Sequence, residues 1–145
     1  MKPIFKFALL AGMLSLTPTF LSAQITGDID ANIPFRFIVN QTTLAPGKYV
    51  IRPVDDESLE IIGAGEHATV FVITMHAEAN KEPARTELVF NRHGNQEFLS
   101  KVFVAGNRYG VELTKSPMEK KLDDAGQKHE VHSQPATLRK KMTKK

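Results

Sequence analysis

The side chains with the most chemical potential in this 145-residue sequence are its five histidines and the acidic residues near them. Two histidines, His129 and His132, flank Glu130 in the segment HEVHS. Zinc proteases place two histidines four residues apart on one helix, with the glutamate acting as the base. The histidines here are three residues apart, and the composition of the segment does not indicate a helix. We therefore expect no catalytic zinc at this segment.

The other three histidines, His67, His76 and His93, fall at predicted strand ends or turns. They could meet at a metal ion only if the fold brought them together, and no ligand spacing in the sequence predicts that. We expect them to be surface residues, and we expect no metal ligand in this chain.

Two further segments resemble chemical sites but lack the required partners. Residues 55–57 form the acidic run DDE, and adjacent acids in a turn are usually only solvated. Gly63 and Gly65 lack the third glycine and the following helix of a dinucleotide-binding loop. The chain has no cysteine, and no serine lies in a G-x-S-x-G motif. We expect no catalytic residue and no cofactor.

The elements around these residues begin with an N-terminal export signal. Lys2 and Lys6 precede a ten-residue apolar run over residues 7–16, and small residues follow at Ser22 and Ala23. This order is typical of a secretory signal peptide, and the run is too short to span a membrane. We predict a signal peptide over residues 1–23 and export to the periplasm or the extracellular space; an uncleaved anchor is the alternative. No later stretch is long enough to span a membrane, so we expect no transmembrane segment in the mature chain.

The charge distribution divides the mature chain into a body and a tail. Residues 24–113 carry eight basic and twelve acidic residues, a net charge of −4, whereas residues 114–145 carry nine and four, a net charge of +5. We predict a β-domain over 24–113, a short helix over 114–126 and a disordered basic tail over 127–145. The absence of cysteine means that the domain must be stabilised by its core alone.

The β-domain is predicted from alternating apolar and polar residues. Residues 28–39 place Ile29, Ile33 and Phe37 on one face and charged residues on the other, which is typical of a half-buried strand. Pro46 and Gly47 indicate a turn, and four further apolar runs follow the strand after it. About six strands predict an all-β, mainly antiparallel fold, as a small sandwich or a partly open barrel. The expected core residues are Phe35, Phe37, Tyr49, Val70, Val72, Phe90 and Phe98.

The short helix is predicted from its capping residues. Ser116 suits the N-cap, Pro117 the first helical position, and Glu119 the third, which together form a capping box. Gly126 would end the helix. Leu113, Met118 and Leu122 could form a small apolar stripe against the sheet.

The basic tail offers a surface for anionic partners. A run of like charges cannot collapse, so it should remain mobile and attract anionic lipid headgroups or glycans of the cell envelope. The alternative is that the tail only keeps the protein soluble, because its charge supports both roles. Nothing in the sequence indicates a specific nucleic-acid partner. The expected anion-binding residues are Arg139, Lys140, Lys141, Lys144 and Lys145.

Four motifs resemble an uncharacterised family of small exported bacterial β-rich proteins. They are an F-x-F-x-V strand, a turn with leucine, proline, glycine, lysine and tyrosine, a phenylalanine-arginine-glycine hairpin and an E-L-x-x-S-x-x-E helix start. The resemblance covers residues 28–122 and implies an exported β-rich domain, but no activity or ligand. The matching positions are Phe35, Phe37, Val39, Leu44, Pro46, Gly47, Lys48, Tyr49, Phe90, Arg92, Gly94, Glu112, Leu113, Ser116 and Glu119.

These observations favour a non-enzymatic β-module that binds a partner in the cell envelope or outside the cell. Two alternatives remain open at this stage. A small barrel with an apolar cavity could carry a small molecule or a lipid. A hydrolase could have its active site divided among loops. The state of the interior, whether filled, hollow or opened by a cleft, discriminates between the three.

Overall fold

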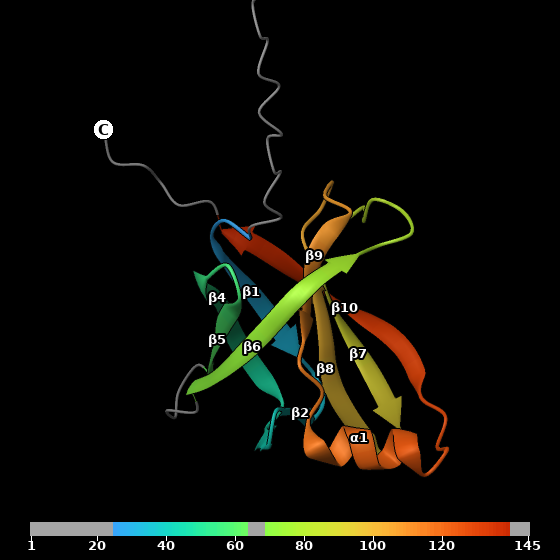
Figure 1. Cartoon of the computed structure of the whole chain (residues 1–145). Coiled ribbons are helices and arrows are strands. Elements are labelled where there is room, and N and C mark those ends of the chain that lie inside the picture. Colours follow the sequence, from blue (N-terminus) through green and yellow to red (C-terminus); the bar gives the residue numbers. More distant parts are fainter. Residues whose placement is uncertain (1–24, 64–68, 140–145) are drawn as a thin grey trace, which may run out of the picture.

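The computed structural model describes residues 25–63 and 69–139, which form ten strands and one helix (Figure 1). The predicted signal peptide therefore lies outside the described residues. The elements in chain order are β1 (Asp28–Ile33), β2 (Phe37–Val39), β3 (Thr42–Leu44), β4 (Gly47–Asp55), β5 (Ser58–Gly63), β6 (Thr69–Glu78), β7 (Glu87–His93), β8 (Gln96–Phe103), β9 (Tyr109–Leu113), α1 (Pro117–Asp124) and β10 (Glu130–Arg139).

Eight of the strands close into a barrel. Their order around it is β1-β4-β5-β6-β9-β8-β7-β10, and β10 pairs again with β1. All eight pairings are antiparallel, whereas the β2–β3 hairpin joins β8 through a parallel pairing. The all-β prediction is confirmed, but the expected sandwich or open barrel of about six strands is wrong. The structure is a closed eight-stranded barrel with two additional strands.

Two long strands make the corners of the barrel. The first half of β6 pairs with β5 and its second half, from Thr74, pairs with β9. In the same way, β10 pairs with β7 through Pro135 and with β1 from Ala136 onward. The closure between β8 and β9 is tight, because a Cβ at Gly110 would lie 2.3 Å from the Val102 carbonyl oxygen. A residue without a side chain is therefore required at this position.

Pro34 accounts for one difference from the predicted strands. The apolar face predicted for residues 28–39 is largely correct, since Ile29, Ile33 and Phe37 are fully buried. The chain nevertheless leaves the sheet between β1 and β2, around Pro34, whose nitrogen cannot donate to a ladder. Thus β1 lies in the barrel wall, whereas β2 pairs with β3 and β8.

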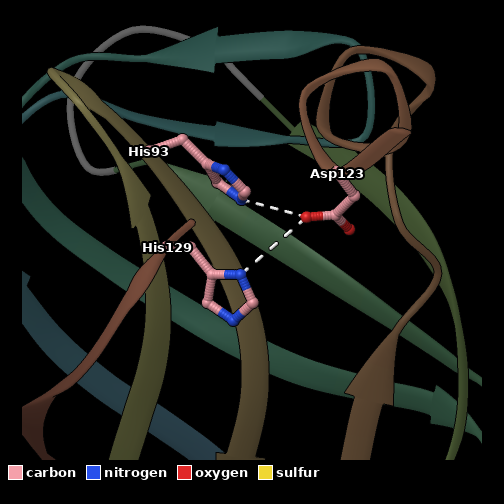
Figure 2. A group of neighbouring side chains, drawn as sticks. All are labelled: His93, Asp123 and His129. Carbon is pink, nitrogen blue, oxygen red and sulfur yellow. Dashed lines mark ion pairs between the residues drawn. The ribbon is translucent and has the colours of Figure 1, made fainter. Parts of the chain in front are cut away.

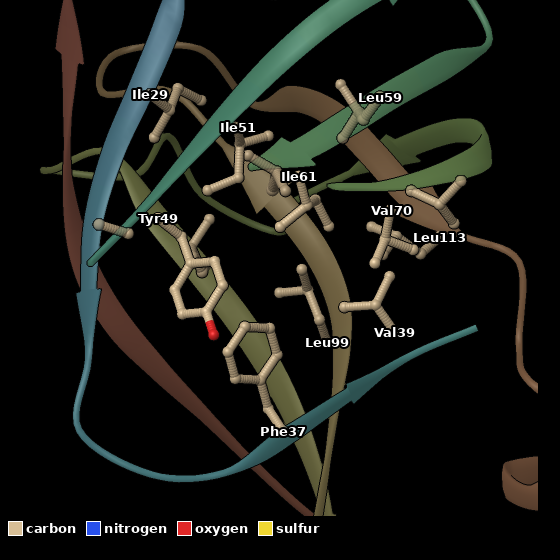
Figure 3. Close-up of a cluster of buried hydrophobic side chains, with 14 of the residues drawn as sticks. Ile29, Phe37, Val39, Tyr49, Ile51, Leu59, Ile61, Val70, Leu99 and Leu113 are labelled. Carbon is tan, nitrogen blue, oxygen red and sulfur yellow. The ribbon is translucent and has the colours of Figure 1, made fainter. Parts of the chain in front are cut away.

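Apolar side chains from all strands from β1 to β9 meet in a single cluster inside the barrel (Figure 3). An eight-stranded barrel is just wide enough for such side chains to fill it. All expected core residues are buried except Phe35, which is partly buried and packs against the cluster. The fully buried members of the cluster are Ile29, Ile33, Phe37, Ile61, Leu88, Phe90 and Val102.

Tyr49 closes the turn that precedes β4. Its hydroxyl group donates a hydrogen bond to the Ala45 carbonyl oxygen, and its ring packs edge-to-face on Phe37 at 5.0 Å between centroids. Burial raises the pKa of Tyr49 above its usual value. Its hydroxyl group therefore remains protonated and serves as a hydrogen-bond donor, which explains this residue structurally.

The largest difference from the sequence prediction concerns residues 127–145, which were expected to form a disordered tail. Residues 130–139 form β10, which lies between β7 and β1 and completes the barrel. The β-domain is therefore not confined to residues 24–113. β10 has few large apolar residues, and it is held by backbone pairing with β7 along its first part and with β1 along its second part. Residues 140–145 lie outside the described residues.

The helix begins as predicted, but its buried face is polar. Ser116 caps α1 by accepting a hydrogen bond from the Glu119 backbone nitrogen, and Gly126, at a φ of 76°, follows its C-terminal end. Met118 is largely exposed, so the expected apolar stripe is not formed. Glu119 and Asp123, four residues apart, share the helix face that meets the end of β7.

Candidate functional site

Three side chains from different parts of the chain converge beside α1 (Figure 2). His93 is the last residue of β7, Asp123 lies in the last turn of α1, and His129 immediately precedes β10. One potential ligand atom from each residue lies within 4.8 Å of the others. We refer to His93, Asp123 and His129 as the histidine cluster.

His93 is the buried member of this cluster, and its side chain is 0% exposed. Its ring packs edge-to-face on Phe98 at 5.5 Å between centroids. Its Nε2 atom lies 3.6 Å from the Glu119 Oε1 atom and 3.7 Å from the Asp123 Oδ1 atom, beyond hydrogen-bonding distance. Among the described residues, neither ring nitrogen has a hydrogen-bond partner. The expectation of a surface histidine is therefore wrong for His93.

Asp123 connects the two histidines. Its Oδ1 atom lies 3.8 Å from the His129 Nδ1 atom, and its Oδ2 atom accepts a hydrogen bond from the Lys115 ammonium group at 2.5 Å. This hydrogen bond, followed by the charges of Lys115, His93 and His129, lowers the pKa of Asp123 below its usual value. The carboxylate is thus held ionised, with one oxygen engaged by Lys115 and the other directed at both imidazoles.

A second buried carboxylate supports the cluster. Glu119 is 3% exposed, and its Oε1 atom accepts a hydrogen bond from the Asn91 amide nitrogen at 2.9 Å. The same nitrogen lies 3.3 Å from the Ser100 hydroxyl oxygen. Glu119 therefore contacts β7. The capping box predicted from the sequence would instead have its carboxylate accept a hydrogen bond from the cap residue. The space beneath α1 is polar and carries negative charge.

The two histidines of HEVHS point to different partners. His129 joins the cluster, whereas the His132 Nε2 atom lies 2.5 Å from a Glu97 carboxylate oxygen. The Glu130 carboxylate forms an ion pair with Arg92 at 2.5 Å. Among the described residues, no ion pair joins Glu130 to His129 or His132. The prediction that this segment is not helical is confirmed, because residues 130–139 form a strand.

The other sequence candidates do not converge. His76 is exposed on β6, as expected, whereas His67 and Gly65 lie outside the described residues. The Asp55 carboxylate caps the β4–β5 turn by accepting hydrogen bonds from the Ser58 hydroxyl group and the Glu57 backbone nitrogen. These bonds lower the pKa of Asp55. A turn-capping role explains this acid.

Of the five predicted anion-binding residues, only Arg139 is described. It ends β10 and forms an ion pair with Asp30 at 2.6 Å, beside Asp28 at 4.0 Å. The positive charge of Arg139 is therefore already paired with carboxylates on β1 of the barrel wall. Lys140, Lys141, Lys144 and Lys145 lie outside the described residues, and their attraction to anionic surfaces stays a prediction.

An apolar row runs along the outward face of β6. Phe71, Ile73 and Met75 occupy alternate positions and are 62%, 68% and 57% exposed. Single exposed apolar residues are common on protein surfaces, but three on one strand form a continuous feature. We refer to these three residues as the β6 row.

Carboxylates border the β6 row. Glu60 is the cross-strand partner of Phe71, and Glu112 is the partner of Met75. Two surface hollows, of about 490 and 410 Å³, both include Ile73 in their lining. The first is lined by Asp55, Asp56, Glu57 and Ser58 together with Ile73. The surface thus combines exposed apolar area with negative charge.

Comparison with protein-family models, curated proteins and solved structures finds no match for this chain. The family resemblance is therefore carried by the four sequence motifs alone. Within the described part of the chain, no helix is both long and apolar enough to cross a membrane.

Proposed function

We propose that this protein is an exported, non-enzymatic β-barrel module that binds a polypeptide segment through the β6 row. The segment it fits has apolar side chains interspersed with lysine or arginine. The observation that carries this proposal is the exposure of Phe71, Ile73 and Met75 on one strand face that is bordered by acidic residues. Apolar contact would supply affinity, and the carboxylates would select a basic partner.

The interior of the barrel favours this function over a carrier. Every strand of the barrel wall except β10 contributes buried side chains to one core cluster. The hollow that reaches the core residues Leu59 and Val111 measures about 190 Å³. Pockets for small ligands usually measure roughly 300–1,000 Å³. The hollow at Leu59 and Val111 is therefore small for a lipid or a drug-sized molecule, whereas the hollow of about 450 Å³ at Ala31 and Tyr49 opens on the barrel surface.

The hydrolase alternative has less support than the binding module. Histidine and carboxylate side chains do converge, but His93 is fully buried beneath α1. A general base must come within hydrogen-bonding distance of a substrate. A buried imidazole of this kind is better suited to binding a small ion or molecule than to contacting a substrate.

The export part of the proposal rests on the N-terminal pattern of Lys2, Lys6 and the apolar run over residues 7–16. Intact-mass measurement of the protein from an envelope or extracellular fraction should give a chain that starts near Gln24. A full-length chain found only in the cytoplasm would contradict export.

The binding surface can be tested with synthetic peptides of defined charge. One immobilised peptide alternates leucine with lysine, and a second alternates leucine with glutamate. The mature chain should bind the lysine peptide more tightly, and added salt should weaken that binding. Replacing both Phe71 and Ile73 with serine should weaken it by about tenfold or more.

Val131 offers a matched control, because it is 64% exposed on β10, outside the β6 row. The Val131→Ser variant should bind like the unchanged chain. Equal binding of both peptides, or unchanged binding by the double serine variant, would contradict the proposal. A dimer in size-exclusion chromatography that the double variant loses would assign the row to self-association and would also overturn it.

A further inference from the structure

We propose that the histidine cluster, His93, Asp123 and His129, binds a divalent transition-metal ion, with Zn²⁺ as the best fit. The site lies beside α1, joins three separate elements and is independent of the binding surface proposed on β6. Three features support a metal ion here: the geometry of the three ligand atoms, the unpartnered nitrogens of His93 and the charge around the site.

Two of the three pairs of ligand atoms are already close to coordination distances, and the third pair lies within 4.8 Å. Ligands at about 2.0–2.1 Å from a tetrahedral zinc ion lie about 3.3–3.4 Å from one another. The Asp123 Oδ1 atom lies 3.7 Å from the His93 Nε2 atom and 3.8 Å from the His129 Nδ1 atom. Shifts of a few tenths of an ångström would bring these two pairs to coordination geometry. His129 lies in a segment after α1 and is partly exposed, so it can move to close the site.

The state of His93 provides an independent observation. A buried polar group normally has a hydrogen-bond partner, and each exception requires an explanation. Among the described residues, both His93 ring nitrogens lack such a partner, although the side chain is fully buried. A metal ion bound at the Nε2 atom would supply a partner for that one of the two nitrogens. Moreover, the Nε2 atom faces the carboxylates rather than the apolar core.

The neighbouring residues orient the carboxylate that would bind the metal. Lys115 holds the Asp123 Oδ2 atom, which leaves the Oδ1 atom directed at both imidazoles. Hydrogen bonds of this kind from residues around a metal site fix the orientation of its ligands. Glu119, held by Asn91, adds a second negative charge within 3.6 Å of His93. Together the two carboxylates outweigh Lys115 and favour a cation.

The donor set selects the class of metal. Two imidazole nitrogens and one carboxylate oxygen suit zinc and its neighbours, whereas Ca²⁺ and Mg²⁺ prefer oxygen ligands. Three protein ligands leave a fourth position for water. Because the ligands come from β7, α1 and the segment before β10, a bound ion would tie the helix to the barrel.

The test uses the mature chain, residues 24–145, freed of metal with a chelator and titrated with Zn²⁺ by calorimetry. We expect saturable binding of one ion per chain. At a hundredfold excess of Zn²⁺ over the Kd, the Tm should rise by on the order of 10 °C. Addition of Co²⁺ should give the visible absorption bands of a low-coordinate site with mixed nitrogen and oxygen ligands.

His129→Ala is the main variant, because this partly exposed residue can be removed with little effect on folding. Its Kd for Zn²⁺ should increase at least about tenfold, and the Tm shift at the same Zn²⁺ concentration should fall to about half or less. Asp123→Asn, which keeps the side-chain shape, should weaken binding in the same way. His76→Ala, an exposed histidine on β6 outside the cluster, is the matched control and should bind like the unchanged chain.

Circular dichroism of each variant without metal establishes that it folds. The proposal is overturned if the unchanged chain shows no saturable binding of one ion. It is also overturned if folded His129→Ala binds Zn²⁺ as tightly as the unchanged chain, or if His76→Ala weakens binding equally. The last result would indicate adventitious binding to surface histidines.

Discussion

Replacing Phe37 with alanine is expected to lower the free energy of unfolding by about 3–5 kcal/mol. Phe37 lies on β2 and is 0% exposed inside the core cluster. Its ring contacts Tyr49 and Phe90 edge-to-face, with centroid distances of 5.0 and 5.8 Å. The substitution removes both aromatic contacts and leaves a cavity in a closed barrel, whose strands cannot easily collapse into it. Urea unfolding followed by circular dichroism measures the change.

Phe71 provides the control for this experiment, because the same substitution occurs there at an exposed position. Phe71→Ala should change the free energy of unfolding by less than about 1 kcal/mol. A loss below about 1 kcal/mol for Phe37→Ala would show that Phe37 is not a core residue. Similar losses for both variants would have the same meaning.

Ending the chain after Gln127 is expected to abolish cooperative folding. This truncation removes β10, which pairs with β7 over residues 130–135 and with β1 over residues 136–139. Without β10, both neighbours would have unpaired backbone groups, and core residues such as Ile29 and Phe90 would be exposed at the gap. Thermal unfolding followed by circular dichroism should show no cooperative transition.

A chain that ends after Arg139 is the matched control, because it keeps β10 and lacks only residues 140–145. It should unfold at nearly the same temperature as the full chain. A cooperative transition of normal Tm in the chain ending at Gln127 would contradict the role of β10 in closing the barrel.

The same control chain tests the predicted anion-binding tail: its binding to anionic liposomes should be lost if Lys140, Lys141, Lys144 and Lys145 provide the attraction.

Local patterns predicted those elements that local interactions stabilise. The alternation in residues 28–39 correctly placed Ile29, Ile33 and Phe37 toward the core, because strand side chains alternate between faces whatever the partner strand. Ser116 was recognised as a helix cap from residues within one turn of it. In contrast, β10 gave no strong apolar pattern, because it is held by backbone pairing, with β7 along residues 130–135 and with β1 along residues 136–139.

The candidate site could be predicted only in part. Each residue of the histidine cluster was visible in the sequence, but His93 and His129 are separated by the β7–β8 hairpin, β9 and α1. One usable signal was the i, i+4 spacing of Glu119 and Asp123, which places two acids on one face of a predicted helix. That spacing does not reveal whether the acidic face meets solvent or, as here, a buried histidine.

The sequence by itself determined the all-β class, the burial of six of the seven expected core residues, the cap of α1 and the non-helical character of HEVHS. Each of these depends on preferences that act within a few residues, such as side-chain alternation and capping. Only the tertiary structure decided the closure of the barrel by β10, the burial of His93 and the pairing of Asp123 with His129. These features depend on contacts between distant segments, which form only when the strands adopt one particular order around the barrel.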